Sequence, residues 1–148
     1  MAIVRGQIRA AVIAGLTGLV TSGSRVFDSR LNPMDAQSMP GICVSIPSEK
    51  PGGEECLSSS ERIADLFIDL YASGAAAEIT LDTMESEIET KLWTMQGGGR
   101  WINSLVLGLS FIGMGTKYDG EGAKVYGIRR LMYSVSYLIN DGDPEHAR

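Results

Sequence analysis

Two short runs near the start of the chain, Val26-Phe27-Asp28-Ser29-Arg30 and Pro40-Gly41-Ile42-Cys43-Val44-Ser45-Ile46, decide how it begins to fold. In the second run, three apolar residues alternate with Cys43 and Ser45, the period of two that is typical of a half-buried strand. The first run indicates a shorter strand over residues 26–31, closed by the turn signal Asn32-Pro33. An amphipathic helix pattern precedes both runs, so the first third of the chain predicts a helix followed by two strands.

The helix expected over residues 3–21 has its apolar residues at helical spacing: Ile8, Val12, Leu16, Leu19 and Val20. Two arginines ahead of the apolar run 10–20 also imitate the start of a signal peptide. The run is shorter than the roughly 20 residues that span a bilayer, and its periodicity favours a retained helix that packs on the core. Gly15 and Gly18 each weaken a helix by about 1 kcal/mol relative to Ala, which predicts close packing at that point.

Residues 48–60 are rich in Ser, Gly, Pro, Glu and Lys, which predicts that the second strand ends at Pro47 and a solvated loop begins. The loop has little apolar area to hold a fixed conformation alone, so we expect a neighbouring protein to order it. Loops of this kind often carry contacts in assemblies. The hypothesis is an assembly contact made by four charged residues of the loop: Glu49, Lys50, Glu54 and Glu55.

The segment 61–73 fits two patterns equally well. A helix is indicated by a capping box of Ser58 and Glu61, followed by apolar residues at helical spacing. A strand is indicated by strict alternation, with one face made of Ala64, Leu66, Ile68 and Leu70. The residue pattern alone leaves both structures open.

The rest of the chain predicts one more helix and a hairpin. Apolar residues at helical spacing follow a capping box of Asp82 and Glu85 and end before glycines 97–99: Leu81, Met84, Ile88, Leu92 and Met95. Alternation over 105–112, a turn-rich stretch and a long second strand then indicate the hairpin. The second strand has one apolar face, made of Leu131, Tyr133, Val135 and Tyr137. Residues 140–148 are expected to form a frayed tail.

Composition limits the classes of function. The chain has 148 residues, of which 44% are hydrophobic and 21% are charged, and we expect a single domain over 1–148. Its formal net charge of −5 argues against broad neutralisation of phosphates, which takes clustered Lys and Arg. Duplex DNA is therefore not an expected ligand.

Residues able to do chemistry do not form a set. His146 lies in the expected tail, where it is poorly placed to act beside a nucleophile. Glu85 and Glu89 lie one helical turn apart, but a solvated helix face explains them. Cys43 and Cys56 lack partners at zinc-finger spacing, and reduced thiols are expected rather than a disulfide. We assign no catalytic, cofactor-binding or metal-binding residue, and no cofactor.

Two glycine motifs imitate nucleotide-binding sites. Gly113-Met114-Gly115 follows an expected strand, but Tyr118 replaces the third glycine and a strand follows in place of a helix. Gly115-Thr116-Lys117 lacks the order of a P-loop. A twisted or bulged strand end explains both. Trp93 and Trp101 are expected to pack in a core or an interface.

The order of these elements resembles the lambda-type tail terminator proteins of long-tailed bacteriophages, the minor tail protein U-like family. The similarity is carried by Arg9-Ala10-Ala11-Val12 in the first helix, the strands at 26–30 and 40–46, and the hairpin that ends in Met132-Tyr133-Ser134-Val135-Ser136-Tyr137. The resemblance implies a strand at 61–73. It implies an α+β fold with a mixed, largely antiparallel sheet, flanked by the N-terminal and a central helix and closing with the C-terminal hairpin.

The resemblance also implies a structural function in place of catalysis. Members of the family form a hexameric ring on the head-proximal end of the tail tube, stop its polymerisation and provide the surface for head attachment. The implied partners are further copies of the chain, the tail tube protein and a neck or head-completion protein, with no membrane. DNA would pass through the ring without specific binding. The implied location is the tail of the virion, after assembly in the host cytoplasm.

Two other readings have support in the sequence. A neck or head-closure adaptor of the head–tail connector shares the size, ring symmetry and acidity expected of a terminator. An exported small-molecule binding protein is supported by the signal-like N-terminus and the two cysteines. An enzyme comes after both, because no set of catalytic residues is present.

Overall fold

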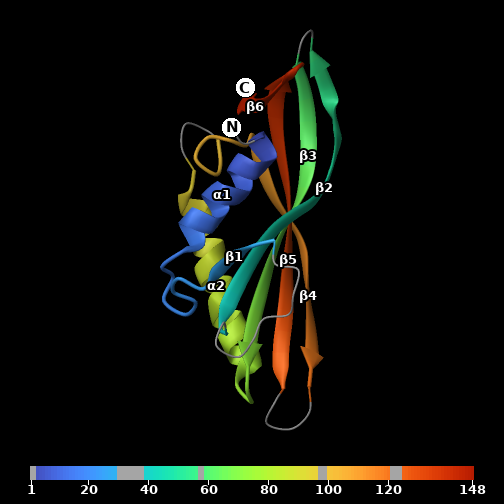
Figure 1. The fold of residues 1–148 in the computed structure, drawn as a ribbon. Coiled ribbons are helices and arrows are strands. Elements are labelled where there is room, and N and C mark those ends of the chain that lie inside the picture. Colours follow the sequence, from blue (N-terminus) through green and yellow to red (C-terminus); the bar gives the residue numbers. More distant parts are fainter. Residues whose placement is uncertain (1–2, 30–38, 57–58, 97–99, 121–124) are drawn as a thin grey trace.

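The computed structural model describes residues 3–29, 39–56, 59–96, 100–120 and 125–148 (Figure 1). Within these ranges the chain forms helix α1 (Val4–Leu16), strands β1 (Val26–Asp28), β2 (Gly41–Cys56) and β3 (Ser59–Ser73), helix α2 (Ala77–Thr94), and strands β4 (Gly108–Asp119), β5 (Tyr126–Asn140) and β6 (Asp143–Ala147). The strand order is β1-β2-β3-β5-β4, and β6 pairs with β5. The β1–β2 pair is parallel and the other described pairs are antiparallel. The expected α+β fold is confirmed.

Both helices lie on the same face of the long, twisted sheet, and the opposite face is left uncovered by helices (Figure 1). The core fills the space between the helices and the sheet. It takes every fourth residue of α1, the predicted face of α2 and alternate residues of the strands. On β5 the predicted apolar face is confirmed as buried, with Leu131, Tyr133, Val135 and Tyr137 each at most 5% exposed.

Helix α1 is shorter than predicted, because Gly18 has φ +94° and turns the chain away from the helix direction. Gly15 lies where a Cβ atom would meet the sulfur of Met95 at 2.7 Å, so its lack of a side chain lets α1 approach the end of α2. Close packing is therefore confirmed at Gly15. Gly18 has open space around it and serves the turn instead.

Segment 61–73 belongs to β3, which pairs with β5 over its whole length from Ser59–Asn140 to Ser73–Tyr126. The strand expected from the family resemblance is thus correct, and the capping box of Ser58 and Glu61 is not used for a helix. The expected capping box of Asp82 and Glu85 is also wrong. Helix α2 starts at Ala77, before both residues, and its N-cap Ala76 makes no side-chain cap bond.

The loop predicted over 48–60 is wrong for most of its length. Strand β2 continues through Pro47 to Cys56, and its pairing with β3 shifts register between Ser45 and Ser48 and again between Pro51 and Glu55. These irregularities make room for the prolines in the strand. A bulge leaves some backbone groups without a partner in the ladder, so the N–H that proline lacks is not needed there. Residues 57–58 lie outside the described part of the chain.

The frayed tail predicted over 140–148 is replaced by β6, which pairs with the end of β5. His146 lies in this strand, where Asp143 contacts its Nδ1 at 2.8 Å and raises the pKa of the imidazole. The backbone of Gly142, with φ +82°, makes the turn between the strands.

Cys43 and Cys56 lie at opposite ends of β2, on the order of 40 Å apart at the rise of an extended strand. A disulfide needs Cα atoms within about 7 Å, so the two cysteines of one chain do not meet. Cys43 itself is buried. Among the described residues, neither helix has the length and apolar character needed to cross a membrane.

Candidate assembly surface

Strand β4 forms one edge of the sheet, with β5 on one side and, among the described residues, no strand on the other. It contains no proline, and several of its large apolar side chains reach solvent: Phe111 is 52% exposed, Ile112 59%, Met114 45% and Tyr118 51%. We call these four residues the apolar edge. Unpaired N–H and C=O groups beside exposed apolar side chains are the features of a strand that can pack against another chain.

The register of β4 determines where the apolar edge points. Phe111 lies opposite Tyr133, and Met114 opposite Leu131. Both partners belong to the buried face of β5, so these side chains point to the side of the sheet that carries the helices. The glycine-containing stretch predicted to be a bulge is confirmed as one, since the register shifts between Phe111 and Gly113. The bulge keeps Phe111 and Met114 on the same side, with ring centroids of Phe111 and Tyr133 5.4 Å apart.

Helix α2 presents a line of carboxylates toward this strand. Glu78, Asp82, Glu85 and Glu89 are three or four residues apart and so share one side of the helix; we call them the acidic row. Glu78 hydrogen-bonds Tyr118 of β4, and Asp82 and Glu85 face Arg129 of β5. The acidic row therefore lies beside the apolar edge along most of the helix.

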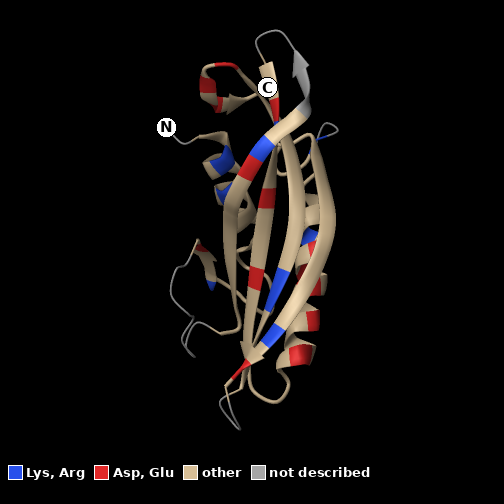
Figure 2. Ribbon diagram, turned by 90° about the vertical axis from the view of Figure 1, so that its right-hand side faces the viewer, with Lys and Arg blue, Asp and Glu red and all other residues tan. Residues whose placement is uncertain are grey.

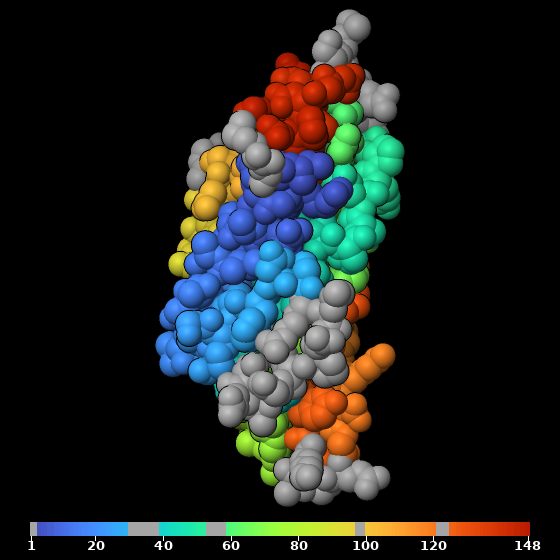
Figure 3. Space-filling view, viewed as in Figure 1, coloured from blue at the N-terminus to red at the C-terminus, as the bar shows by residue number. Residues whose placement is uncertain are grey.

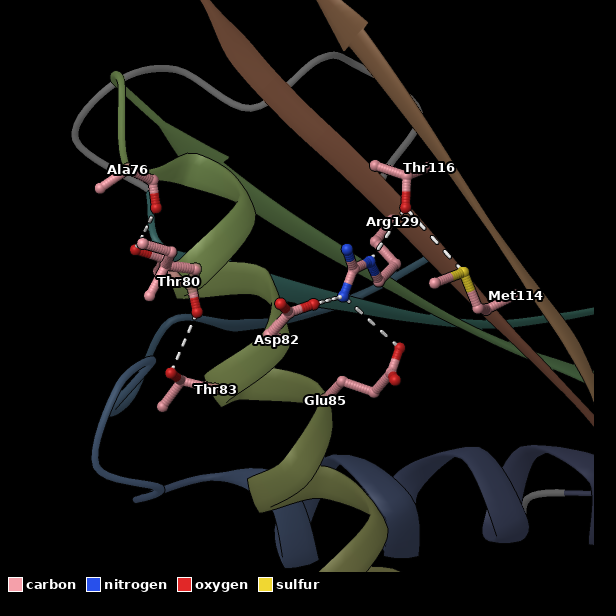
Figure 4. A network of polar contacts seen from close by, with 9 residues as sticks. Ala76, Thr80, Asp82, Thr83, Glu85, Met114, Thr116 and Arg129 are labelled. Carbon is pink, nitrogen blue, oxygen red and sulfur yellow. Dashed lines mark hydrogen bonds and ion pairs between the residues drawn. The ribbon is translucent and has the colours of Figure 1, made fainter.

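Arg129 is the basic residue that holds α2 to the strands at this place (Figure 4). Its side chain is 3% exposed, and its Nη1 donates to Asp82 at 2.5 Å and lies 3.7 Å from Glu85. Its Nε donates to Thr116 Oγ1 of β4 at 2.9 Å. One guanidinium thus joins α2, β5 and β4 through three partners.

The acidic row has more negative charge than Arg129 neutralises. Burial raises the pKa of Glu85, and neighbouring Glu89 and Asp82 raise it further, while Arg129 acts in the opposite direction. One oxygen of Glu85 is buried without a hydrogen-bond partner. Burial, with Glu89 and Glu85 nearby, also raises the pKa of Tyr133 to about 12. A cation brought to this surface would therefore be favoured.

An aromatic hollow continues the same surface past the end of the acidic row. It has a volume of about 300 Å³ and is lined by residues of α2, β4 and β5 together with Trp101. Trp93 is 71% exposed and its ring lies 4.9 Å from that of Trp101. Tryptophan is enriched at protein interfaces. Of the two environments expected for Trp93 and Trp101, a core or an interface, the exposed position of Trp93 favours the interface.

The opposite edge of the sheet is built differently. Within the described part of the chain, β1 pairs only with the start of β2, and the part of β2 beyond this pairing carries Pro47, Lys50 and Pro51. Short edge strands, prolines and lysines all oppose the addition of another strand. We call this side, β1 with residues 45–51 of β2, the guarded edge.

Glu49, expected to make an assembly contact, instead lies inside the molecule beside the guarded edge. Its side chain is 11% exposed and accepts from Arg5 of α1 at 2.9 Å, Arg62 of β3 at 3.3 Å and the hydroxyl of Tyr137. This network joins α1 to three strands. The exposed Lys50 lies on the other face of β2. Glu54 and Glu55 belong to β2, and their side chains lie outside the described part.

The face of the sheet without helices carries both acidic and basic residues on its strands (Figure 2). Asp69 of β3 accepts from two nitrogens of Arg130 of β5, at 2.8 and 3.1 Å, and this guanidinium lies 4.6 Å from the centre of the Phe67 ring. A shallow hollow of about 430 Å³ adjoins this pair. The charges of Asp69 and Arg130 are thus matched across the two strands.

The acidic row and the apolar edge were not predicted from the sequence as a site. The signal for the row was present in the spacing of its acids, but Glu85 and Glu89 read as a solvated face. Glu85 is instead partly buried against Arg129, and the pairing of β4 with β5 alone decides that Arg129 lies there. Within the described residues, no group of three or more His, Cys, Asp or Glu residues is placed to hold a metal ion.

Comparison with known proteins gives the class of the molecule. The family model described as phage minor tail protein U matches residues 3–137, which include both helices and nearly all of β5. The protein is therefore a structural component of a phage tail, located in the tail of the virion. More specifically, the chain belongs to the phage minor tail protein U family, and the resemblance drawn from its sequence is confirmed.

Among solved structures, one chain of the "Virion of native gene transfer agent (GTA) particle" is similar to this protein. The two are 21% identical, with a TM-score of 0.47, over 90% of this chain and 91% of that chain. A search of curated proteins found no match.

Proposed function

We propose that this protein is a tail terminator. Copies of it form a ring, of six subunits, on the head-proximal end of the tail tube, stop further addition of tube subunits and present a surface to the neck. The observation that carries the proposal is the family match over residues 3–137. Its partners in this role are further copies of the chain, the tail tube protein and a neck or head-completion protein.

The difference between the two edges of the sheet supports head-to-tail contacts, as in a ring, and opposes a filament in which like edges of neighbouring sheets pair. A closed ring needs two different surfaces that meet head to tail, so that no face is left to add further subunits. The apolar edge and the guarded edge are unlike each other, so the subunit is not symmetric about its sheet and like edges do not favour pairing with each other. A terminator also needs its tube-facing and neck-facing sides to differ, which a single subunit type achieves by lying in one orientation in the ring.

Charge is consistent with a ring through which DNA passes. Each chain has a formal net charge of −5, so six copies carry about −30. A negative ring repels the phosphate backbone and does not hold it during transit. The role requires binding surfaces and no catalytic group.

Deletion of the gene from the phage tests the proposal. Tails are imaged by electron microscopy after infection with the deleted phage, and with the same phage complemented by a plasmid copy. A terminator predicts tubes of irregular and excessive length without heads, and normal virions after complementation. Tails of normal length that lack heads would indicate the neck adaptor instead. Normal tails joined to heads would reject both.

A further inference from the structure

We infer that the aromatic hollow is a binding site for one arginine side chain of a different protein of the tail. The hollow combines aromatic rings with a carboxylate, and these are the groups that attract an organic cation. The inference rests on the proposed function only in seeking the occupant among the other proteins of the tail. It requires no particular contact between copies of this chain.

The rings of the hollow surround it in different orientations. Four aromatic side chains line the space: Trp93, Trp101, Phe111 and Tyr133. The two tryptophan rings are 4.9 Å apart and tilted by 56°, and the other two rings are 5.4 Å apart and inclined by 66°. Residues 100–107, gold in Figure 3, lie at the surface beside the end of α2, in yellow. A side chain of a neighbouring protein can therefore reach rings that attract a cation over their faces.

The hollow has an acidic wall. Glu89 lines it and precedes Trp93 by one helical turn. Burial, with Glu89 and Glu85 nearby, raises the pKa of Tyr133, which also lines the hollow, to about 12. Among the described residues that line the hollow, none is basic. A neutral side chain would displace water from Glu89 without giving it a partner, whereas a cation would pair with it.

Arginine is the cation that fits best, because its planar guanidinium stacks on aromatic rings and is more weakly hydrated than an ammonium group. A different protein is the source, because the arginines of this chain are already used within the subunit. Apart from Arg148, the described arginines hydrogen-bond or ion-pair with carboxylates or backbone carbonyls of the same chain: Arg5, Arg9, Arg25, Arg62, Arg100, Arg129 and Arg130. Even Arg100, next to Trp101 in the sequence, donates to the carbonyl of Arg148 at 2.6 Å.

The first test measures binding of small probes. N-acetyl-arginine methylamide is titrated into the protein, with its neutral isostere N-acetyl-citrulline methylamide as the matched control, while the indole N–H signals of the two tryptophans are followed by NMR. The arginine probe should shift both signals with saturation in the millimolar range. The citrulline probe should bind about tenfold more weakly, because it has no charge. Equal binding of the two probes, or no shift with the arginine probe, would overturn the inference.

The second test removes the rings and the charge separately. Trp93→Ala removes a ring and Glu89→Gln removes the charge but keeps the size of the side chain. Each should weaken binding of the arginine probe by about tenfold, read at the signal of Trp101, with the circular dichroism spectrum of the wild type. Ile79→Ala, which replaces another exposed side chain of α2, is the control and should leave binding unchanged. Unchanged binding in either hollow variant would overturn the inference.

The third test identifies the source of the side chain in the assembled tail. Benzoylphenylalanine is incorporated in place of Trp93 in complete virions, the virions are irradiated, and crosslinked peptides are sequenced by mass spectrometry. The inference expects a peptide of a different tail protein with an arginine at or next to the crosslinked residue, and changing that arginine to glutamine should abolish the adduct. A peptide from a second copy of this chain, a peptide without arginine, or no adduct would overturn it. The terminator role is judged separately, by the length of the tails that the deleted phage makes.

Discussion

At the β1–β2 edge of the sheet, β1 has only three residues and β2 contains two prolines. At the opposite edge, β4 has twelve residues, no proline and four exposed apolar side chains. Charge differs in the same sense. Beside the guarded edge, Glu49 is enclosed by two arginines and a tyrosine, while beside β4 Arg129 pairs with Asp82 and Glu85, two of the four carboxylates of the acidic row. On the first side, the charged groups find their partners within the subunit. On the second side, apolar side chains stay exposed and carboxylates outnumber their basic partner.

This difference shows how a structural protein of a phage tail keeps a specific surface available. Unpaired strand edges are hazards, because they associate with any other edge. Here one edge is closed by prolines, and the other is bordered by a helix whose carboxylates repel a second copy of itself. The exposed edge can therefore select a partner, since apolar area provides contact and charge decides which surface is accepted.

The largest effect is expected where α1 joins the side of the guarded edge. Val12 is fully buried, so Val12→Asp places an unpaired charge in the core at a cost of several kcal/mol, against a total stability of about 5–15 kcal/mol. The variant should fail to fold, as measured by circular dichroism and solubility. Ala14→Asp, at an exposed position of the same helix, is the control and should remain folded. A soluble, folded Val12→Asp would show that α1 is not part of the core.

The next effect tests whether Glu49 completes its side of the molecule. Glu49→Leu leaves Arg5 and Arg62 without their shared carboxylate, which should lower the free energy of unfolding by about 3 kcal/mol in urea denaturation. Lys50→Gln changes the adjacent, exposed residue and should alter stability by less than about 0.5 kcal/mol. Equal stabilities for the two variants would mean that Glu49 is available for contacts outside the subunit, as its sequence context predicted.

Replacing both prolines of the guarded edge should change stability less than the variants above, but it should increase association between copies of the chain. The double variant Pro47→Thr and Pro51→Thr restores two strand-forming residues with backbone donors. Its stability should change by about 1 kcal/mol or less, while size-exclusion chromatography should reveal new aggregates. Ser48→Thr is the control, since it leaves both prolines in place. A double variant that elutes like the wild type would show that the prolines do not protect this edge.

The order and type of the elements could be predicted because the signals were local. Alternation in β5 and helical spacing in α2 are properties of neighbouring residues, and both were correct in the structure. The strand at 61–73 could not be chosen by pattern, since β3 pairs along its whole length with β5, from Ser59–Asn140 to Ser73–Tyr126, far away in the sequence. At this segment, the pairing of β3 with β5 decides between a helix and a strand.

The predicted loop failed for a related reason. Prolines and glycines usually interrupt strands, yet β2 continues through Pro47 and Pro51, because both lie at its register shifts against β3. Glu49 was accordingly read as solvated, because nothing in its sequence context indicates that Arg5 and Tyr137 meet it. The assembly surface was hidden in the same way, since Arg129 joins α2 to β4 only in the folded chain.

The smallest effect concerns the acidic row. Burial, Glu89 and Asp82 raise the pKa of Glu85 above 4.5, so the folded state binds a proton more tightly than the unfolded state. Stability therefore falls as pH rises from 4.5 through the raised pKa, because ionised Glu85 is disfavoured in the fold. Glu85→Gln should lack this decline and, near pH 7, exceed the wild type by about 0.5 kcal/mol or less.

The pH dependence is measured by urea denaturation between pH 4 and 7, together with a carboxyl NMR titration of the wild type. Glu89→Gln is the matched control: it keeps Glu85 but removes a neighbouring charge, so the midpoint of Glu85 should move back toward 4.5. A wild-type midpoint at or below 4.5 would mean that Arg129 alone balances the acidic row. The two edges would then differ in shape but not in charge.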